Sequence, residues 1–386
     1  MGEDIFSSVI NTVKIVIIFL FMVHMVPLLV WVERRASAFM QNRFGPNRVG
    51  PFGLTQLLAD LVKFIFKEDF ASSKTNKFYF YLAPVLAIIP VALAFGSLPL
   101  SSPIYIDSFQ LFGYSLGPYL FEIRSFPMDV GIIFVFGVSS LAVYSLLLAG
   151  WSSGSKFSLL GALRASAQAI SYELALSLSL LGVLILFNTF SFDQIIEMQN
   201  QSLNFQFFSK EIKINFLPNW GIFYQPLGAL LLFVALFAEA NRLPFDLPEA
   251  EAELVAGYHT EYGGIKIIIF YMGEYGHMLV ASSLMVILYF GGYNLYPLLN
   301  EEILQSWLLP NFSLTATSLL TSLILFLCFF LKVLFFLWVF IWVRWTLPRF
   351  RYDQLMDLGW KTLLPWSLFN AIATAVVIWL VNWGNA

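Results

Sequence analysis

The sequence predicts an all-α integral membrane protein, and three observations lead to this fold class. Hydrophobic residues make up 59% of the 386 residues and charged residues only 12%, whereas a soluble chain is about one-quarter charged. The chain contains eight apolar windows of roughly 20 residues, the length that crosses the hydrocarbon core as a helix. Basic residues gather in alternate loops between these windows, as they do in multi-span membrane proteins.

Each apolar window is expected to be a helix, because lipid offers no hydrogen-bond partner to an unpaired backbone. The expected spans are, in chain order, about residues 9–32, 76–98, 129–150, 166–188, 222–240, 265–290, 317–343 and 362–383. No linker between them is long enough for a second domain. We therefore expect residues 1–386 to form a single membrane domain.

The charge distribution predicts the orientation of the bundle. The loops after the odd spans hold most of the 21 Lys and Arg residues, and the loops after the even spans hold three: Arg124, Lys210 and Lys213. The positive-inside rule places the base-rich loops in the cytoplasm and both termini outside, on the periplasmic side. No cleavable signal is expected, because no basic segment precedes the first apolar stretch. These features fit a bacterial plasma membrane, with the mitochondrial inner membrane as the alternative.

The first base-rich loop predicts a rigid turn region followed by an interfacial helix. Residues 43–53 carry three Gly and two Pro, a density that favours a fixed irregular loop. In residues 54–67 apolar and polar side chains recur on opposite stripes at helical spacing, which predicts an amphipathic helix at the membrane surface. Such a helix is either a lipid anchor or one wall of a cavity that opens to the lipid and admits a hydrophobic substrate.

Acidic residues gather where charge is costly. Residues 238–262 contain six Asp or Glu residues and one base, Arg242. Glu173, Glu274 and Lys332 lie inside expected spans, where a charged group must face the bundle interior or water. Carboxyl groups in such a setting suit proton exchange near neutral pH. Paired structural carboxylates are the alternative interpretation.

The other loops carry weaker signals. The basic, Pro-bent segment 344–361 is either an interfacial belt or a positive docking face for a soluble partner. The segment 200–216 has strand-like alternation in part and is expected to be a surface excursion. There is no phosphate-binding or dinucleotide glycine motif, no Cys cluster for iron–sulfur and no basic patch typical of nucleic-acid binding. Any redox role therefore needs partners that carry the electrons.

Several of these segments together resemble one family. Its signatures are matched by Glu33–Asp69, Gly150–Glu173, Ala238–Gly264, Glu274 with Tyr275, and Arg344–Lys361. The family is the H-type membrane component of the proton-pumping NADH-quinone oxidoreductase, respiratory complex I, and its mitochondrial counterpart is the first of the NADH dehydrogenase membrane subunits. The match covers all eight expected spans. The departures are small: Ala240 replaces a usual Thr, Gly154 a usual Asn and Leu57 a frequent Pro.

The resemblance implies a role for particular residues. Such proteins form most of the tunnel through which a quinone reaches the junction with the hydrophilic arm. The residues expected at the quinone cavity or its mouth are Glu33, Arg34, Arg43, Asp60, Arg242, Asp246, Glu249 and Tyr275. Those expected to form the acidic path for protons are Glu173, Glu239, Glu249, Glu251, Glu253 and Glu274. Arg349 and Arg351 are expected near the contact with a cytoplasmic partner.

The same resemblance implies the cofactors and partners. No cofactor is expected on this chain; quinone is the substrate, and FMN and iron–sulfur clusters belong to partner subunits. The expected partners are the quinone-site subunits of the hydrophilic arm, neighbouring small membrane subunits and lipid, with no nucleic acid.

Three other functions stay open on the sequence. One is the membrane subunit of a related hydrogenase-type complex. Another is an ion-coupled transporter, although no internal repeat of the kind that builds such proteins is visible. The third is a structural anchor for a peripheral enzyme, which would have no use for acids inside the membrane.

Overall fold

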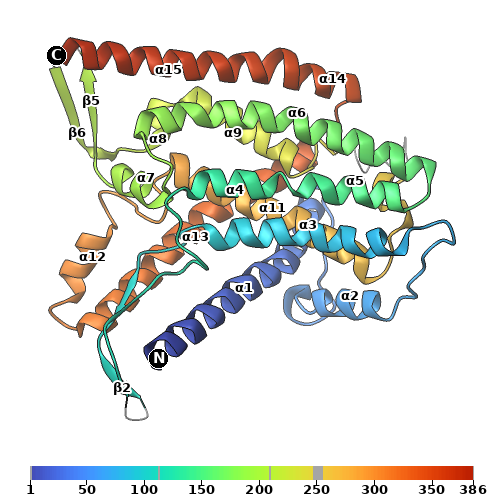
Figure 1. The fold of residues 1–386 in the computed structure, drawn as a ribbon, viewed down its shortest axis with the longest axis horizontal. Helices are drawn as coiled ribbons and strands as arrows, with labels where there is room; N and C mark the ends of the chain where they lie inside the picture. Colours follow the sequence, from blue (N-terminus) through green and yellow to red (C-terminus); the bar gives the residue numbers. More distant parts are fainter. Residues whose placement is uncertain (1, 112–113, 208–209, 247–254, 386) are drawn as a thin grey trace.

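The computed structural model describes residues 2–111, 114–207, 210–246 and 255–385. Most of the long helices run side by side along the longest axis of the molecule, and the helices that begin at Gly2 and at Leu314 lie obliquely to them (Figure 1). Seven helices in this part of the chain are long and apolar enough to cross a membrane: Ser8–Met40, Lys77–Ser97, Gly131–Ser152, Lys156–Phe187, Ile265–Tyr289, Leu314–Thr346 and Tyr352–Val381. The predicted fold class, an all-α membrane protein, is confirmed.

The expected count of eight spans is not confirmed, because the window 222–240 forms shorter helices. These are α8 (Gly221–Tyr224) and α9 (Pro226–Glu239). At 1.5 Å per residue, the 14 residues of α9 reach only about 21 Å, short of a hydrocarbon core of about 30 Å. Proline at position 226 has no N–H to continue α8, so the helix starts afresh there. A short helix is tolerated inside a membrane bundle where protein surrounds it.

The long helices have the following bounds. They are α1 (Gly2–Met40), α3 (Lys77–Ser97), α4 (Gly131–Ser139) followed by α5 (Ala142–Ser152), α6 (Lys156–Phe187), α11 (Ile265–Tyr289) and α13 (Leu314–Thr346). The C-terminal rod consists of α14 (Tyr352–Asp357), the π-helical turn η3 (Leu358–Leu363) and α15 (Leu364–Asn385).

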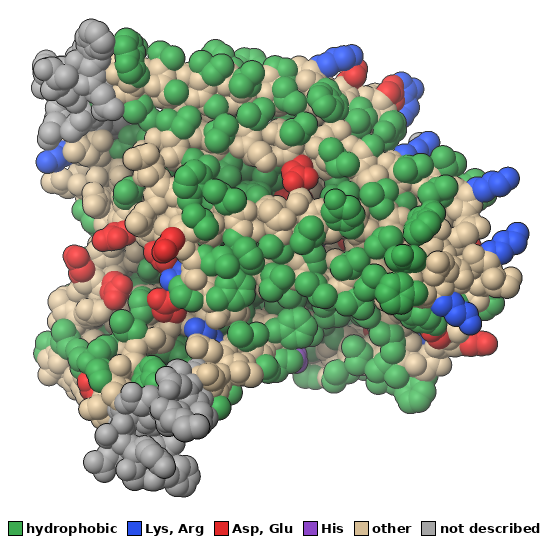
Figure 2. All heavy atoms as spheres, viewed as in Figure 1, with side chains coloured by type: hydrophobic (Ala, Val, Ile, Leu, Met, Phe, Trp, Pro, Cys, Tyr) green, Lys and Arg blue, Asp and Glu red, His purple; other side chains and the backbone are tan. Residues whose placement is uncertain are grey.

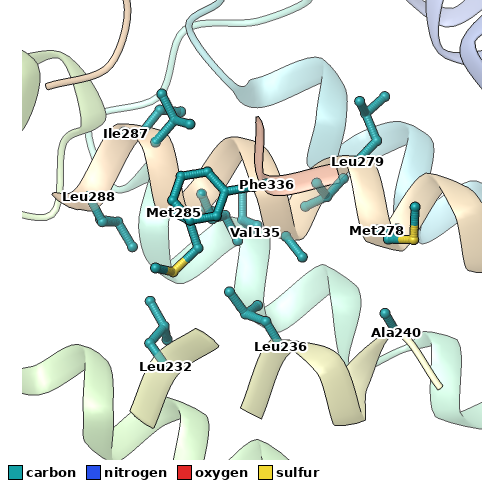
Figure 3. Packing of buried hydrophobic residues seen from close by; sticks show 14 of the residues in the cluster. Val135, Leu232, Leu236, Ala240, Met278, Leu279, Met285, Ile287, Leu288 and Phe336 are labelled. Atoms are coloured by element: carbon teal, nitrogen blue, oxygen red, sulfur yellow. The ribbon is translucent and has the colours of Figure 1, made fainter. Parts of the chain in front are cut away.

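Helix α11 is the centre of the bundle, and α1, α3, α9 and α13 pack around it. In Figure 3, Leu232 and Leu236 of α9 lie opposite Met285 of α11, with Phe336 of α13 beside them. Glycines in α11 allow a neighbour to come close: a Cβ at position 276 would lie 2.5 Å from the Cγ1 of Val91 on α3. The polar residues of α11 are therefore held in a tightly packed core.

At one end of the bundle lie the turn η1 (Pro51–Gly53) and helix α2 (Gln56–Ile65). The predicted amphipathic helix is confirmed, and it lies beside α1 at the edge of the bundle (Figure 1). The preceding loop needs glycine at position 53, where φ is +76° and a Cβ would lie 2.2 Å from the Pro46 carbonyl oxygen. The short helix η2 (Gly257–Glu261) packs against α6 and α5.

The opposite end carries antiparallel hairpins and short helices. The predicted excursion 200–216 is a hairpin of β5 (Ser202–Phe207) and β6 (Lys210–Pro218). The other strand pairs are β1 (Ile104–Ile106) with β4 (Tyr119–Phe121) and β2 (Phe109–Leu111) with β3 (Tyr114–Leu116). The short helices there are α7 (Phe192–Gln199) and α12 (Glu301–Leu308).

Acidic and basic surface side chains lie mainly at opposite ends of the longest axis of the molecule. Figure 2 shows a broad hydrophobic belt, with Lys and Arg side chains at the right edge and a group of Asp and Glu side chains at the left. Both termini lie on the left side of this view, away from the basic edge (Figure 1). The side of the membrane that each edge faces stays a prediction from the positive-inside rule.

Candidate functional site

A cluster of buried charges joins α1, α11 and α13 near the base-rich end. Glu33 of α1 is 7% exposed, and its Oε2 accepts a hydrogen bond of 2.8 Å from the hydroxyl of Tyr275 on α11. Its Oε1 accepts a second hydrogen bond from the guanidinium of Arg344, at the end of α13. A buried carboxylate is costly unless it is paired and hydrogen-bonded, and Glu33 has both kinds of partner.

The ring of Tyr275 also contacts a buried cation. The guanidinium carbon of Arg242, in the segment after α9, lies 3.8 Å from the ring centroid of Tyr275. Its Nη2 lies 3.9 Å from Oε2 of Glu274, and Oε1 of Glu274 accepts a 2.9 Å hydrogen bond from the hydroxyl of Tyr258. Contacts therefore run without a gap from Glu33 through Tyr275 and Arg242 to Glu274.

The last base-rich loop is tied to the acidic segment beside this cluster. Nη2 of Arg349 lies 3.0 Å from Oδ2 of Asp246, which is 7% exposed. The backbone N–H of Phe350 also donates to the carbonyl of Pro244, at 3.3 Å. A movement of the segment 241–246 is thus coupled to the position of the loop after α13.

The first base-rich loop is joined to α1 by a different set of contacts. Nη1 of Arg34 lies 2.5 Å from Oδ2 of Asp60 on α2, and Gln56 donates to Oδ1 of Asp60 at 3.1 Å. Burial alone would raise the pKa of Asp60, but the hydrogen bonds from Arg34 and Gln56 outweigh it and hold that pKa below its ordinary value. Arg43 is exposed, and its Nε donates to Gln41 at 2.7 Å.

Arg35 also holds this loop, a role that sequence reasoning missed. Its guanidinium carbon lies 5.3, 5.7 and 5.9 Å from the ring centroids of Trp31, Phe39 and Phe52. Its Nη1 donates to the carbonyl of Phe52 at 3.2 Å. In the sequence it is one of two adjacent bases at the end of a span, with no signal to separate it from Arg34.

A small chamber with both polar and apolar lining residues adjoins the charged cluster at Glu274. Its volume is about 50 Å³. Its polar lining consists of Ser139, Ser145, Glu239, Asn241, Tyr258, Glu274 and His277. A buried water needs roughly 10–15 Å³ of such space, so the chamber has room for a few waters. Two acids of the predicted proton path, Glu239 at the end of α9 and Glu274 on α11, therefore face one cavity.

Comparison with known proteins identifies the family. A family model described as NADH dehydrogenase matches residues 13–375. The chain belongs to this family. It is 58% identical to the H component of the NADH-quinone oxidoreductase of Bdellovibrio bacteriovorus over 383 residues, 99% of each chain. It is 42% identical to the protein of the same name from Salinibacter ruber over 349 residues, 90% of each chain, and 41% identical to NADH-quinone oxidoreductase subunit 8 of Rhodothermus marinus over 354 residues, covering 92% and 93%.

The resemblance inferred from the loop motifs is thereby confirmed, and so is the membrane character of this NADH dehydrogenase family member. Its relatives are subunits of an oxidoreductase complex. The predicted residue roles remain predictions.

Some predicted residues of this family member lie apart from the cluster or outside the described residues. Arg351 is exposed and pairs with Asp353. Glu173 is partly buried on α6, one helical turn from Ala169, which lines the chamber. The acids Glu249, Glu251 and Glu253 lie outside the described residues.

Lys332, one of the basic residues inside a span, is bound by backbone carbonyl groups. Its Nζ donates to the carbonyl oxygens of Phe290, Gly292 and Asn294, at 2.8, 3.0 and 2.6 Å. These carbonyls follow the C-terminus of α11, where helix carbonyls lack partners and cations are favoured. Its ammonium therefore caps α11. Among the described residues, no group of three or more His, Cys, Asp or Glu side chains is arranged to hold a metal ion.

Proposed function

We propose that this chain is the membrane-arm subunit of a proton-pumping NADH:quinone oxidoreductase. It forms the quinone-access tunnel at the junction with the hydrophilic arm and couples quinone reduction to proton translocation. The observation that carries the proposal is the unbroken series of contacts from Glu33 to the chamber that holds Glu239 and Glu274. This series joins the base-rich end of the bundle to carboxyl groups inside it.

The quinone side of the proposal uses the charged cluster and the first loop. The lipid-facing amphipathic helix α2, tied to α1 by Asp60 and Arg34, forms one wall of the opening for a hydrophobic substrate. Quinone reduction takes up protons in a site with little water, so the charge balance around it changes. Arg34, Arg43 and Arg242 are the cations that respond to that change, together with Glu33, Asp246, Glu249 and Tyr275.

The proton side uses the chamber and its neighbours. Arg242 touches both Tyr275 and Glu274, so a new negative charge that draws the guanidinium toward the quinone side weakens its contact with Glu274. Glu274 then holds a proton more readily, and it exchanges that proton with Glu239 through water in the chamber. The other acids assigned to this path are Glu173, Glu249, Glu251 and Glu253.

Membership of the family also supports a role for this chain without redox centres, a partner contact and a membrane location. This chain is a non-redox subunit of the enzyme, and electrons arrive from FMN and iron–sulfur clusters in partner subunits. The face around Arg349 and Arg351 meets a partner of the hydrophilic arm. The chain is a single membrane domain that lies in a bacterial plasma membrane, with both termini on the periplasmic side.

The test compares Glu239→Gln and Glu274→Gln with wild type in inverted membrane vesicles. Each variant is assayed for NADH-to-quinone activity, NADH-to-ferricyanide activity and acidification of the vesicle interior. Ferricyanide takes electrons upstream of the quinone, so it reports assembly of the electron-carrying arm. Glu302→Gln is the matched control, because Glu302 is an exposed acid on α12 at the opposite end of the bundle.

We expect both chamber variants to lose roughly tenfold or more of coupled quinone turnover, as when a positioned acid or base is removed. Ferricyanide activity and the control are expected to stay at wild-type levels. Wild-type turnover and acidification in both chamber variants would remove these acids from the path and favour a purely structural anchor.

A further inference from the structure

One titratable side chain of the chamber has no place in the function proposed above. His277 lies on α11 three residues after Glu274, about one turn further along the helix, and it lines the same cavity of about 50 Å³. The side chain is partly buried. Within the described part of the chain, no group hydrogen-bonds to its imidazole. Among the described residues, its ring nitrogens therefore have no protein partner, and the residue lines the chamber.

The rest of the lining offers few groups that exchange protons. Helix α3 contributes Ala87, α6 contributes Ala169, and α4 and α5 contribute hydroxyl groups already donated to carbonyls of their own helices. Within the described residues, the titratable groups that face the chamber are Glu239 from α9, Tyr258 from η2, and Glu274 and His277 from α11. His277 is the imidazole among two carboxyl groups and a phenol.

Imidazole has a property that the other three groups lack. A neutral imidazole donates at one ring nitrogen and accepts at the other, so it takes a proton on one side and releases another on the opposite side. An ionised carboxylate only accepts, and two carboxylates that face one small cavity resist being ionised together. A ring between water and these carboxyl groups lets a proton pass without leaving both of them charged.

We propose that His277 is a further proton-carrying residue of this subunit, acting between the chamber water and the carboxyl groups of Glu274 and Glu239. A proton bound by one ring nitrogen gives an imidazolium, and the opposite nitrogen then releases its proton to water or carboxylate. The ring returns to its first tautomer by the reverse exchange or by rotation, so no charge and no electrons are left over. This inference rests on the proposed function, because it assigns a residue to the same path.

The alternative is a purely structural role, in which the ring of His277 only fills space beside the chamber. Two substitutions separate the roles: His277→Phe keeps an aromatic ring, and His277→Gln keeps a polar side chain, but neither transfers protons. Met278→Leu is the matched control, because Met278 is the next residue of α11, packs in the hydrophobic core and tolerates an isosteric change (Figure 3). A third variant, His277→Ala, leaves room for a small added base.

The experiment measures protons translocated per NADH by the intact complex in proteoliposomes at neutral pH. We expect both His277→Phe and His277→Gln to lose at least half of the wild-type ratio, while ferricyanide activity and the control stay unchanged. In His277→Ala we expect added imidazole to restore the ratio and thiazole, a ring of similar size but a much weaker base, to leave it low.

The inference is overturned if His277→Gln pumps with the wild-type ratio, or if imidazole and thiazole act alike on His277→Ala. If the complexes with His277→Phe and His277→Gln fail to assemble, the rescue of His277→Ala by added imidazole decides whether the ring carries protons. Parallel assays of Glu239→Gln and Glu274→Gln separate the two proposals. Loss of pumping in these two with normal pumping in the histidine variants refutes only the role of His277, whereas normal pumping in all of them refutes the chamber path itself.

Discussion

Replacing Lys332 with Met tests whether a charge inside a span is structural or carries ions. The substitution keeps an unbranched side chain of similar length and removes the ammonium that donates to three carbonyls after α11. A hydrogen bond from a charged donor contributes about 1.5–3 kcal/mol, and three would sum to roughly 4–9 kcal/mol. Burial of the ammonium costs several kcal/mol and offsets roughly half of this sum, so the net stabilisation is about 2–4 kcal/mol.

We expect this free energy to oppose the local unfolding of residues 290–294. The amides of Gly292 and Asn294 donate to the carbonyls of Val286 and Gly291, at 3.0 and 3.1 Å, and are protected only while this turn is closed. A loss of about 2–4 kcal/mol corresponds to hydrogen exchange roughly 30- to 700-fold faster in this segment. The measurement is hydrogen–deuterium exchange by mass spectrometry on the assembled complex.

Leu331→Met is the control for this measurement, because Leu331 is the preceding residue of α13 and is largely exposed on the bundle surface. Protons pumped per NADH should be unchanged in Lys332→Met. Unaltered exchange in residues 290–294 would refute the capping role. Unaltered exchange together with lost pumping would instead place Lys332 among the ion-handling groups.

Two further predictions concern the contacts around the site. Tyr258→Phe removes one hydroxyl that donates to Glu274. One hydrogen bond contributes about 1 kcal/mol, so coupled proton uptake should fall roughly 3- to 10-fold while ferricyanide activity stays intact. An unchanged rate of proton uptake would make this contact irrelevant to coupling. The pKa of Asp60 lies below its ordinary value, so the ion pair with Arg34 stabilises the α1–α2 contact above the unfolded pKa and is lost as pH falls through the folded one. In Arg34→Gln, spin labels on α1 and α2 should separate at a higher pH than in wild type, and equal transition pH values would contradict this account.

The sequence predicted those features that depend on one segment and its solvent. Apolar length identified seven spans, and helical spacing identified α2, because lipid and water impose these patterns directly. The remaining window, 222–240, is apolar for another reason. Helix α9 is enclosed by other helices, so its residues must be apolar although it is too short to span alone. Composition does not separate a lipid-facing helix from one surrounded by protein.

The site was predicted as a set of residues but not as pairs. Bilayer energetics singled out Glu274, and the loop composition singled out Arg242. The contacts of Arg242 with Glu274 and Tyr275 depend on how the segment after α9 meets α11. The partner of Glu33 is Arg344, 311 residues away, and it was counted only as a base in the last loop. His277 gave no signal, since a lone histidine in an apolar helix is usually a core residue.

The arrangement of the buried charges favours coupling through exchange of partners over coupling through simple proximity. Tyr275 donates its hydroxyl to Glu33 and offers its ring face to Arg242, so a change at either contact alters the other. At 3.9 Å, the contact between Arg242 and Glu274 is too long for a hydrogen bond, so a small shift of the guanidinium changes its strength without breaking a bond. Arg349 ties the same segment to the last loop, so the partner proposed to dock there would bias the same balance. Under the proposed coupling, the acids of the chamber would respond to charge at the base-rich end through a small displacement of the Arg242 guanidinium.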